Sequence, residues 1–409
     1  MSTFLTFLNL EKIFFNLTVQ NVYSLLKQDL PNLIGIGCPA HILNNCVHHS
    51  TDQLSIDIEC ILFKIYQHFS IYAVRTEELK SFCQFVEIEY KKVLSHSKTR
   101  FLSLGPHLTR VLEILPAFIA YFNSISKPPA VIAKFFKNPL HYLYLLFLDS
   151  FLTVFHEGIQ KIEKEKISVV EMSLSLNNIF EILEHRRKHL FLNTKIKSEL
   201  KKLEHQGYGK EIEVFMKDVG LMYECSIEYL EKWSASFRDF KVLNWMELGS
   251  PSEWDEVQQS LTFLSDRGVN LDEEKLFDEY CGLSRFVTKE ATDPVYINLM
   301  AHERWAKYFK ACGQIFPVQL QTVAQFYFSI MPHNANVERV FSMMVTQWSD
   351  ERDNLKVETV ESILQVQYNW KDLTCSDFYN LCIDDSKLLK QIKSNEKYTN
   401  SKLSNSTDI

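Results

Sequence analysis

Glycine and proline are scarce in this chain, with 11 of each among 409 residues. Because both residues favour turns, this scarcity excludes a sandwich of many short strands and leaves long helices as the expected filling. The 46% share of apolar residues excludes a disordered or collagen-like chain, since it is enough to build a buried core. The composition is that of a globular, mainly α protein.

Closely spaced cysteines are also missing. The nine cysteines are odd in number and widely spread, and no two of them have C-x-x-C spacing. This pattern excludes a small disulfide framework, so we expect reduced thiols in an intracellular protein.

The chain has no long uncharged apolar run. Its most apolar stretch, residues 131 to 155, is interrupted by Lys134, Lys137 and Asp149, and its longest uncharged part is too short to cross a bilayer. The first twelve residues lack the basic segment and the cleavage site of a signal peptide. We therefore expect no membrane contact and a nuclear or cytoplasmic location, with the nucleus favoured.

Positive charge is in short supply as well, since the net charge is −7 at pH 7. A chain dominated by phosphate contacts is excluded, and any basic patch must be local. The best patch is residues 184 to 211, where eight Lys or Arg residues, Arg186, Arg187 and Lys188 among them, face four Glu residues. This segment is either a solvated helix face or a nucleic-acid surface, and its few aromatic residues favour the solvated face.

The apolar periodicity is helical almost throughout. The run from Leu33 to Gly37, which lies between two prolines, predicts a buried strand. Residues 41 to 69 predict a long helix with a break near Ser50, and Pro106 suits the first turn of a later helix. Helical periodicity then continues from 130 to 315, and a tail rich in Ser, Asn, Lys and Thr predicts disorder from about 393.

Two apolar stripes follow Phe316 and predict two amphipathic helices. By default such stripes are core faces, but their apolar surface needs cover from elsewhere in the protein or from a partner. Six acidic and three basic residues lie between 317 and 370, which suits contact with protein better than contact with phosphate. The stripes include Val337, Val340, Phe341, Met344, Trp348, Val360 and Leu364.

Two islands of sequence resemble signatures of the hAT transposase superfamily. The first, Cys38-Pro-Ala-His41-Ile-Leu-Asn44, is similar to the C-x-x-H box of the family, and Thr99-Arg-Phe-Leu-Ser103 is similar to its Thr-Arg-Trp-x-Ser element. The second, Ile330-Met-Pro332-His-Asn-Ala-Asn-Val-Glu338-Arg-Val-Phe-Ser342, resembles the carboxy-terminal dimerisation region of the family. The resemblance covers roughly residues 21 to 370.

The resemblance implies a mainly α chain with an incomplete RNase H-like core remnant, a large helical insertion and a carboxy-terminal helical dimerisation region. The core would be truncated at its amino-terminal side, because 37 residues before Cys38 are too few for the first strands of such a sheet. We expect an amino-terminal segment at 1–30, the core remnant at 31–126, the insertion at 127–315, the dimerisation region at 316–373 and a tail at 374–409.

The resemblance also bears on catalysis. Transposases of this kind hold two divalent cations with three carboxylates, and the resemblance places the third carboxylate on Glu338. Only Glu11 and Asp29 precede Cys38, and neither has the sequence context of a catalytic aspartate. The implied protein is therefore a domesticated, catalytically inactive relative without a cofactor, in which Glu338 is a remnant and the activity is dimerisation with itself or with a related hAT-derived protein.

Two alternative functions stay open. One is residual, sequence-independent DNA binding through Arg100, Phe101 and the basic segment. The other is an active metal-dependent transposase or nuclease that takes carboxylates from another chain. Cys38 and His41 could supply half of a zinc site, but a second ligand pair is missing, so a buried thiol and a hydrogen-bonded histidine are preferred there.

Overall fold

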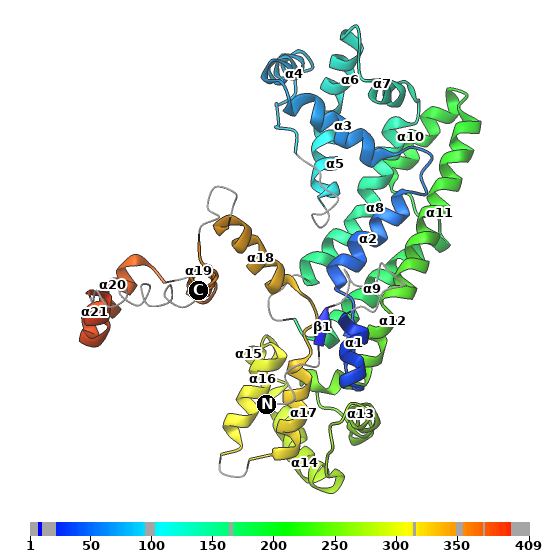
Figure 1. Ribbon diagram of the computed structural model, residues 1–409. Coiled ribbons are helices and arrows are strands. Elements are labelled where there is room, and N and C mark those ends of the chain that lie inside the picture. Colours follow the sequence, from blue (N-terminus) through cyan, green and yellow to red (C-terminus); the bar gives the residue numbers. More distant parts are fainter. Residues whose placement is uncertain are drawn as a thin grey trace. The chain divides into compact units, whose positions relative to one another are not determined.

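The computed structural model confirms a mainly helical chain. It describes residues 7–9, 22–94, 103–162, 167–313, 316–348, 355–370 and 373–393. The chain forms two compact units, Met1–Asn334 and Ala335–Ile409 (Figure 1). The boundary between the two units, after Asn334, does not coincide with any of the predicted domain limits at 30, 126, 315 and 373, which stay predictions.

The first unit contains two short strands, a 3-10 helix and most of the helices. In chain order they are β1 (Phe7–Asn9), α1 (Val22–Asp29), β2 (Ile34–Ile36), α2 (Pro39–Thr51), α3 (Ile58–Ser70), α4 (Ala73–Phe85), α5 (Leu104–Glu113), α6 (Leu115–Ser124), α7 (Ala130–Lys137), α8 (His141–Ile162), α9 (Val169–Lys188), α10 (Thr194–His205), α11 (Gly209–Trp233), α12 (Ala235–Arg238), η1 (Asp239–Glu247), α13 (Trp254–Ser265), α14 (Glu273–Glu290), α15 (Pro294–Ile297), α16 (Ala301–Ala311) and α17 (Val318–Ser329).

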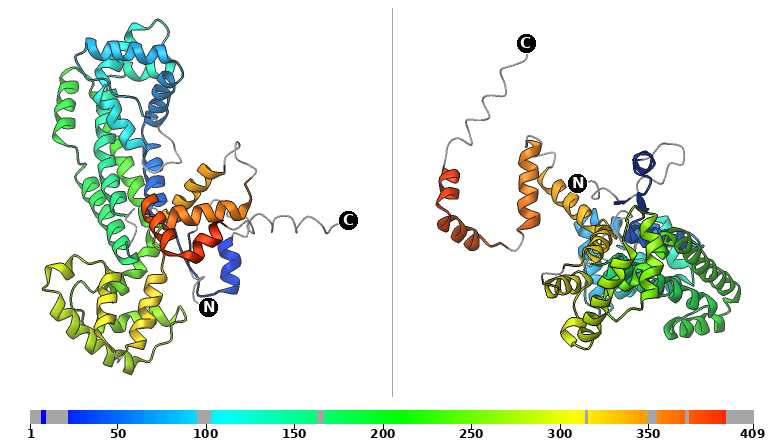
Figure 2. Two further views of the ribbon diagram at one scale, coloured as in Figure 1. Left: turned by 90° about the vertical axis from the view of Figure 1, so that its left-hand side faces the viewer. Right: turned by 90° about the horizontal axis from the view of Figure 1, so that it is seen from below.

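Four helices, α2, α8, α9 and α11, lie side by side along the first unit, and each packs against two of the others (Figures 1 and 2). Phe147, Phe151 and Phe155 recur every fourth residue of α8 and are fully buried. The rings of Phe147 and Phe151 each lie 5.8 Å from the ring of Tyr223 on α11. Burying one such side chain contributes about 2 kcal/mol, so this aromatic row is a main source of bundle stability.

Gly158 sets the distance between α8 and α9. A Cβ atom added there would lie 2.3 Å from Cδ1 of Ile179 on α9. Any larger residue at this position would therefore require the Ile179 side chain to shift.

Helices α3 to α7 form a cluster at one end of the four long helices (Figures 1 and 2). The ring of Phe69 lies 5.1 Å from that of Tyr121 and 5.8 Å from that of Phe122. His68 shares a 3.0 Å hydrogen bond with the Tyr121 hydroxyl. Burial, helped by the positive charge of Arg75, lowers the pKa of His68 to about 4, so the imidazole is neutral at physiological pH.

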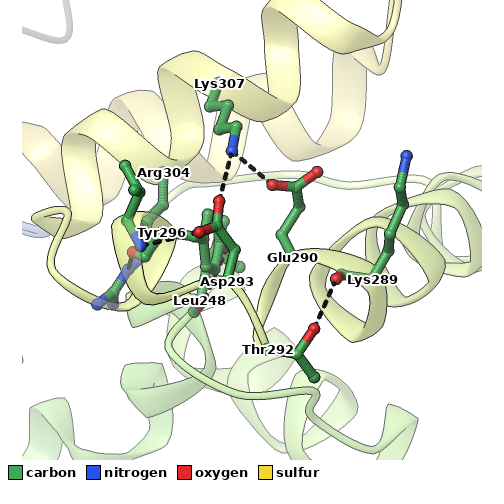
Figure 3. A network of polar contacts seen from close by, with 9 residues as sticks. Leu248, Lys289, Glu290, Thr292, Asp293, Tyr296, Arg304 and Lys307 are labelled. Carbon is green, nitrogen blue, oxygen red and sulfur yellow. Dashed lines mark hydrogen bonds and ion pairs between the residues drawn. The ribbon is translucent and has the colours of Figure 1, made fainter.

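Helices α13 to α17 surround η1 at the other end of the long helices (Figures 1 and 2). Figure 3 shows the polar network that fixes α15 there, with Lys307 between two carboxylates. Arg304 donates to the carbonyl oxygen of Glu247 at 2.7 Å, and the Tyr296 hydroxyl donates to that of Leu248 at 2.9 Å. These bonds satisfy the carbonyl groups at the end of η1, where Leu248 turns the chain with a φ of 51°.

The strand predicted between Leu33 and Gly37 is confirmed as β2. It pairs in parallel with β1, with Phe7 opposite Ile34 and Asn9 opposite Ile36. In the described part of the chain this pair of three-residue strands is the whole of the sheet structure, so an RNase H-like core stays a prediction.

The helix predicted from 41 to 69 is interrupted, and the break divides α2 from α3. The carboxylate of Asp218 on α11 holds the intervening turn, because it accepts the Ser55 amide at 2.8 Å and the Ser55 hydroxyl at 3.0 Å. The Tyr144 hydroxyl on α8 donates to the same carboxylate at 2.7 Å. Asp218 therefore joins the turn to two of the long helices.

The second unit contains α18 (Ala335–Gln347), α19 (Val357–Asn369), α20 (Cys375–Asp384) and α21 (Ser386–Lys393). The two amphipathic helices predicted after Phe316 are confirmed as α18 and α19, which pack on each other, and α20 packs on α21. The predicted tail thus begins with two helices, and the residues from 394 on, where disorder is predicted, lie outside the described ones.

Candidate functional site

The junction between β2 and α2 carries the first sequence island. Cys38 is extended, with φ −69° and ψ 120°, and Pro39 takes the first helical position, where no amide donor is needed. The Cys38 side chain is buried, as expected, and its thiol donates to Oδ1 of Asn334 at 2.9 Å.

This thiol–amide bond joins the two sequence islands, whose contacting residues are 296 positions apart. The chain reaches Asn334 from the end of α17 through a segment in which Ile330 and His333 are buried. The first island and the Ile330–Asn334 part of the second island therefore lie side by side in the first unit.

A zinc site at this junction would need ligands beyond Cys38 and His41. His41 is half-buried in the first turn of α2. Across the residues that the structure describes, no three His, Cys, Asp or Glu side chains are grouped so that they could hold a metal ion.

A groove with a volume of about 760 Å³ opens beside the junction. It is lined by glycines in and after β2, by residues of α2, and by the end of α11 with the start of α12. The lining residues are Gly35, Gly37, Ile42, Asn45, His49, Cys225, Glu228, Tyr229, Lys232, Trp233, Ala235 and Ser236.

Three rings follow one another along this groove. The His49 ring stacks on Tyr229 at 5.0 Å, and Tyr229 lies 6.0 Å from Trp233. The ammonium of Lys232 sits 5.3 Å from the centre of the Trp233 ring. Burial raises the pKa of Tyr229 to about 12, so its hydroxyl is neutral, and the exposed Glu228 and Lys232 carry opposite charges. The groove suits apolar or planar groups better than a polyanion.

Two cysteines hold α2 against α11. The Cys46 thiol donates to the Ser226 carbonyl at 3.4 Å, and the Cys225 thiol donates to the His49 carbonyl at 3.4 Å. Burial raises the pKa of both thiols, so neither is a ready nucleophile. The contacts are those of structural residues.

The predicted dimerisation stripe on α18 is divided between two faces. Val340 and Met344 are half-buried, whereas Val337, Phe341 and Trp348 are exposed. The exposed residues, with Val345, recur at spacings of three and four and so occupy one face of the helix. On α19, Val360 is buried and Leu364 is half-buried.

Glu338, the predicted remnant carboxylate, lies in the first turn of α18 and is half-buried. A carboxylate is favoured at this position by the helix dipole. Glu338 belongs to the second unit, and β2 belongs to the first.

The basic segment is partly committed to internal contacts. Arg186 donates to the Ser150 carbonyl at 2.7 Å and lies over the Phe191 ring, and Arg187 pairs with Glu184 at 3.8 Å. Lys188 is exposed at the end of α9. The other predicted DNA contacts, Arg100 and Phe101, lie outside the described residues.

Sequence reasoning missed the groove and the apolar surface of α20. Tyr229 and Trp233 are four residues apart, which is a visible helical spacing, but their partner His49 is on another helix. On α20, Phe378, Tyr379, Leu381 and Ile383 are exposed. Their apolar run was a usable signal, although the segment was assigned to a tail.

The comparisons with known proteins do not identify a family. No family model matches this chain, and no match was found among curated proteins. Among the helices of the described residues, none combines the length and apolar character that a bilayer crossing demands.

Proposed function

We propose that this protein acts by self-association through its second unit, and that it is a catalytically inactive relative of the hAT transposases. The observation that carries the proposal is the exposed apolar face of α18. Phe341 is 50% exposed and Val345 is 67% exposed, and both lie in the middle of that face.

The rest of the second unit adds to this surface. Val357, Val366 and Trp370 on and after α19 are exposed, as are four large apolar side chains of α20. Exposed apolar side chains in this number are typical of protein contact sites, because leaving them in water costs free energy. In a dimer, the apolar surface of each copy would be covered by the same surface of the other copy.

The relation to hAT transposases is supported by the contact between Cys38 and Asn334, which joins the two islands that resemble this family. The absence of catalysis is supported by the strands. Such enzymes carry aspartates on core strands, whereas the two strands among the described residues, Phe-Leu-Asn in β1 and Ile-Gly-Ile in β2, contain none.

The test is the molar mass of the full chain by gel filtration with light scattering. We expect a dimer at tens of micromolar and a monomer for Val345→Asp, because a carboxylate in the covered face would lose its hydration. Val74→Asp is the matched control, since Val74 is 70% exposed on α4 of the first unit. A wild-type chain that is monomeric at this concentration contradicts the proposal.

A second candidate function is weak DNA binding by the basic segment. Four lysines there, Lys188, Lys197, Lys201 and Lys210, are exposed, and within the described chain they form no ion pair. Duplex affinity should fall steeply with salt, and Lys197→Glu with Lys201→Glu should lower the slope by about two. Binding that does not change with salt would remove this candidate.

A further inference from the structure

The second unit carries opposite charges on different helices. α21 has lysines at positions 387, 390 and 393 and no acidic residue. α18 and α19 together carry three acidic residues, Glu338, Glu358 and Glu361, and one basic residue, Arg339. One chain thus presents both halves of a complementary pair of surfaces.

Two charged pairs within these surfaces have the same spacing. Glu358 and Glu361 lie three positions apart on α19, and Lys387 and Lys390 lie three positions apart on α21. Residues with this spacing are separated by about 4.5 Å along a helix axis, on neighbouring faces. All four side chains are exposed, and none forms an ion pair with another described residue.

We propose that α21 of one chain docks on α19 of a second copy, so that Lys387 and Lys390 of each copy meet Glu358 and Glu361 of the other. This inference rests on the self-association proposed above. A closed two-fold dimer requires one surface to be complementary to itself, and here the contact would form twice. The neighbouring exposed Val357 would supply apolar contact, while the charges would fix the orientation.

The test uses two full-length variants. One carries Glu358→Lys with Glu361→Lys, and the other carries Lys387→Glu with Lys390→Glu. Each variant alone brings like charges together, so its dimer dissociation constant, measured by sedimentation equilibrium, should rise about tenfold. An equimolar mixture should recover wild-type affinity as a heterodimer, because every docked pair is then opposite in charge.

A matched control reverses two exposed lysines of the first unit, Lys289→Glu with Lys310→Glu, and should leave the dissociation constant unchanged. If the wild type dimerises and both test variants have the same dissociation constant as the wild type, the pairing is wrong but the self-association stands. A mixture that stays as weak as its components would also overturn it, because the contact would then lie within one chain. A monomeric wild-type chain would overturn both proposals.

α21 is a basic amphipathic helix, and such helices can instead bind an anionic lipid surface. Sedimentation with phosphatidylserine vesicles distinguishes this role. If Lys387→Glu with Lys390→Glu abolishes vesicle binding and leaves the dimer unchanged, the lysines serve a membrane surface and the proposed docking is wrong.

Discussion

At the scale of single residues, Asp218 is the buried polar group whose removal should destabilise the fold most. It is 4% exposed and accepts three hydrogen bonds from Ser55 and Tyr144. Removing a buried carboxylate leaves these donors without an acceptor, which costs more than the bonds themselves contribute.

We expect Asp218→Ala to lower the free energy of unfolding by about 3 kcal/mol, and Tyr144→Phe to lower it by about 1 kcal/mol. Urea unfolding followed by circular dichroism measures both changes. The exposed Asp278 provides the control, since Asp278→Asn should change stability by less than about 0.5 kcal/mol. Equal effects at the two aspartates would show that the buried bonds are unimportant.

His68 should make the first unit sensitive to acid. Its pKa is about 4 in the folded chain and about 6.5 in an unfolded one. Between these values the unfolded state binds more protons, so stability falls as the pH is lowered from 6.5 to 4. The loss amounts to about 3 kcal/mol at most.

We expect His68→Phe, which keeps a ring but does not titrate, to lose less stability than the wild type between neutral pH and the pKa of His68. Thermal melting across that range measures the difference. Parallel pH profiles for the two proteins would show that His68 is hydrated in the folded state.

The sequence predicted the environment of a single residue only where that environment depends on neighbouring positions in the chain. The burial of Cys38 follows from its place between an apolar strand and a helix, and it is confirmed. Its partner Asn334 is 296 positions away, and no local pattern points to it. Arg186 similarly looks like part of a basic face, but its guanidinium binds the Ser150 carbonyl on another helix.

At the scale of elements, periodicity predicted the helices well, because α2, α3, α18 and α19 each repeat apolar residues every three or four positions. Which side of a stripe is covered depends on tertiary packing. Val340 and Phe341 are adjacent in one predicted stripe, yet Val340 is half-buried and Phe341 is exposed. The groove was unpredictable for the same reason, since it exists only where α2 and α11 meet.

The contact between α8 and α9 gives a prediction about packing. Alanine is a better helix former than glycine by about 1 kcal/mol, yet Gly158→Ala should not stabilise the protein, because its methyl group would collide with Ile179. Ile179→Val removes the colliding Cδ1 atom. The double variant should therefore be more stable than the sum of the single effects predicts, by about 1 kcal/mol. Strict additivity would mean that Ile179 moves aside freely.

At the scale of the whole molecule, the chain divides at Asn334, inside the island that resembles the dimerisation region. The resemblance placed α17 with the dimerisation helices, but α17 packs on α14 and η1 in the first unit. Sequence similarity marks a continuous stretch, whereas a compact unit is defined by contacts, and the two need not end together.

We expect residues 1–334 to fold without the second unit, because the core helices and the Cys38–Asn334 bond all lie within them. The fragment should unfold cooperatively and should be monomeric at concentrations where the full chain dimerises. Calorimetry and light scattering test these two properties. If the fragment is a dimer, the association surface lies in the first unit and not in the second.

The bond between Cys38 and Asn334 also has a mechanical consequence. Asn334 is the last residue before the second unit, so a tensile load applied by a bound partner enters the first unit at the start of α2. Under such a pull the thiol–amide bond is the earliest element in the force path, ahead of the hydrophobic interior. After this bond yields, the buried side chains of His333 and Ile330 still hold the rest of the segment to the first unit.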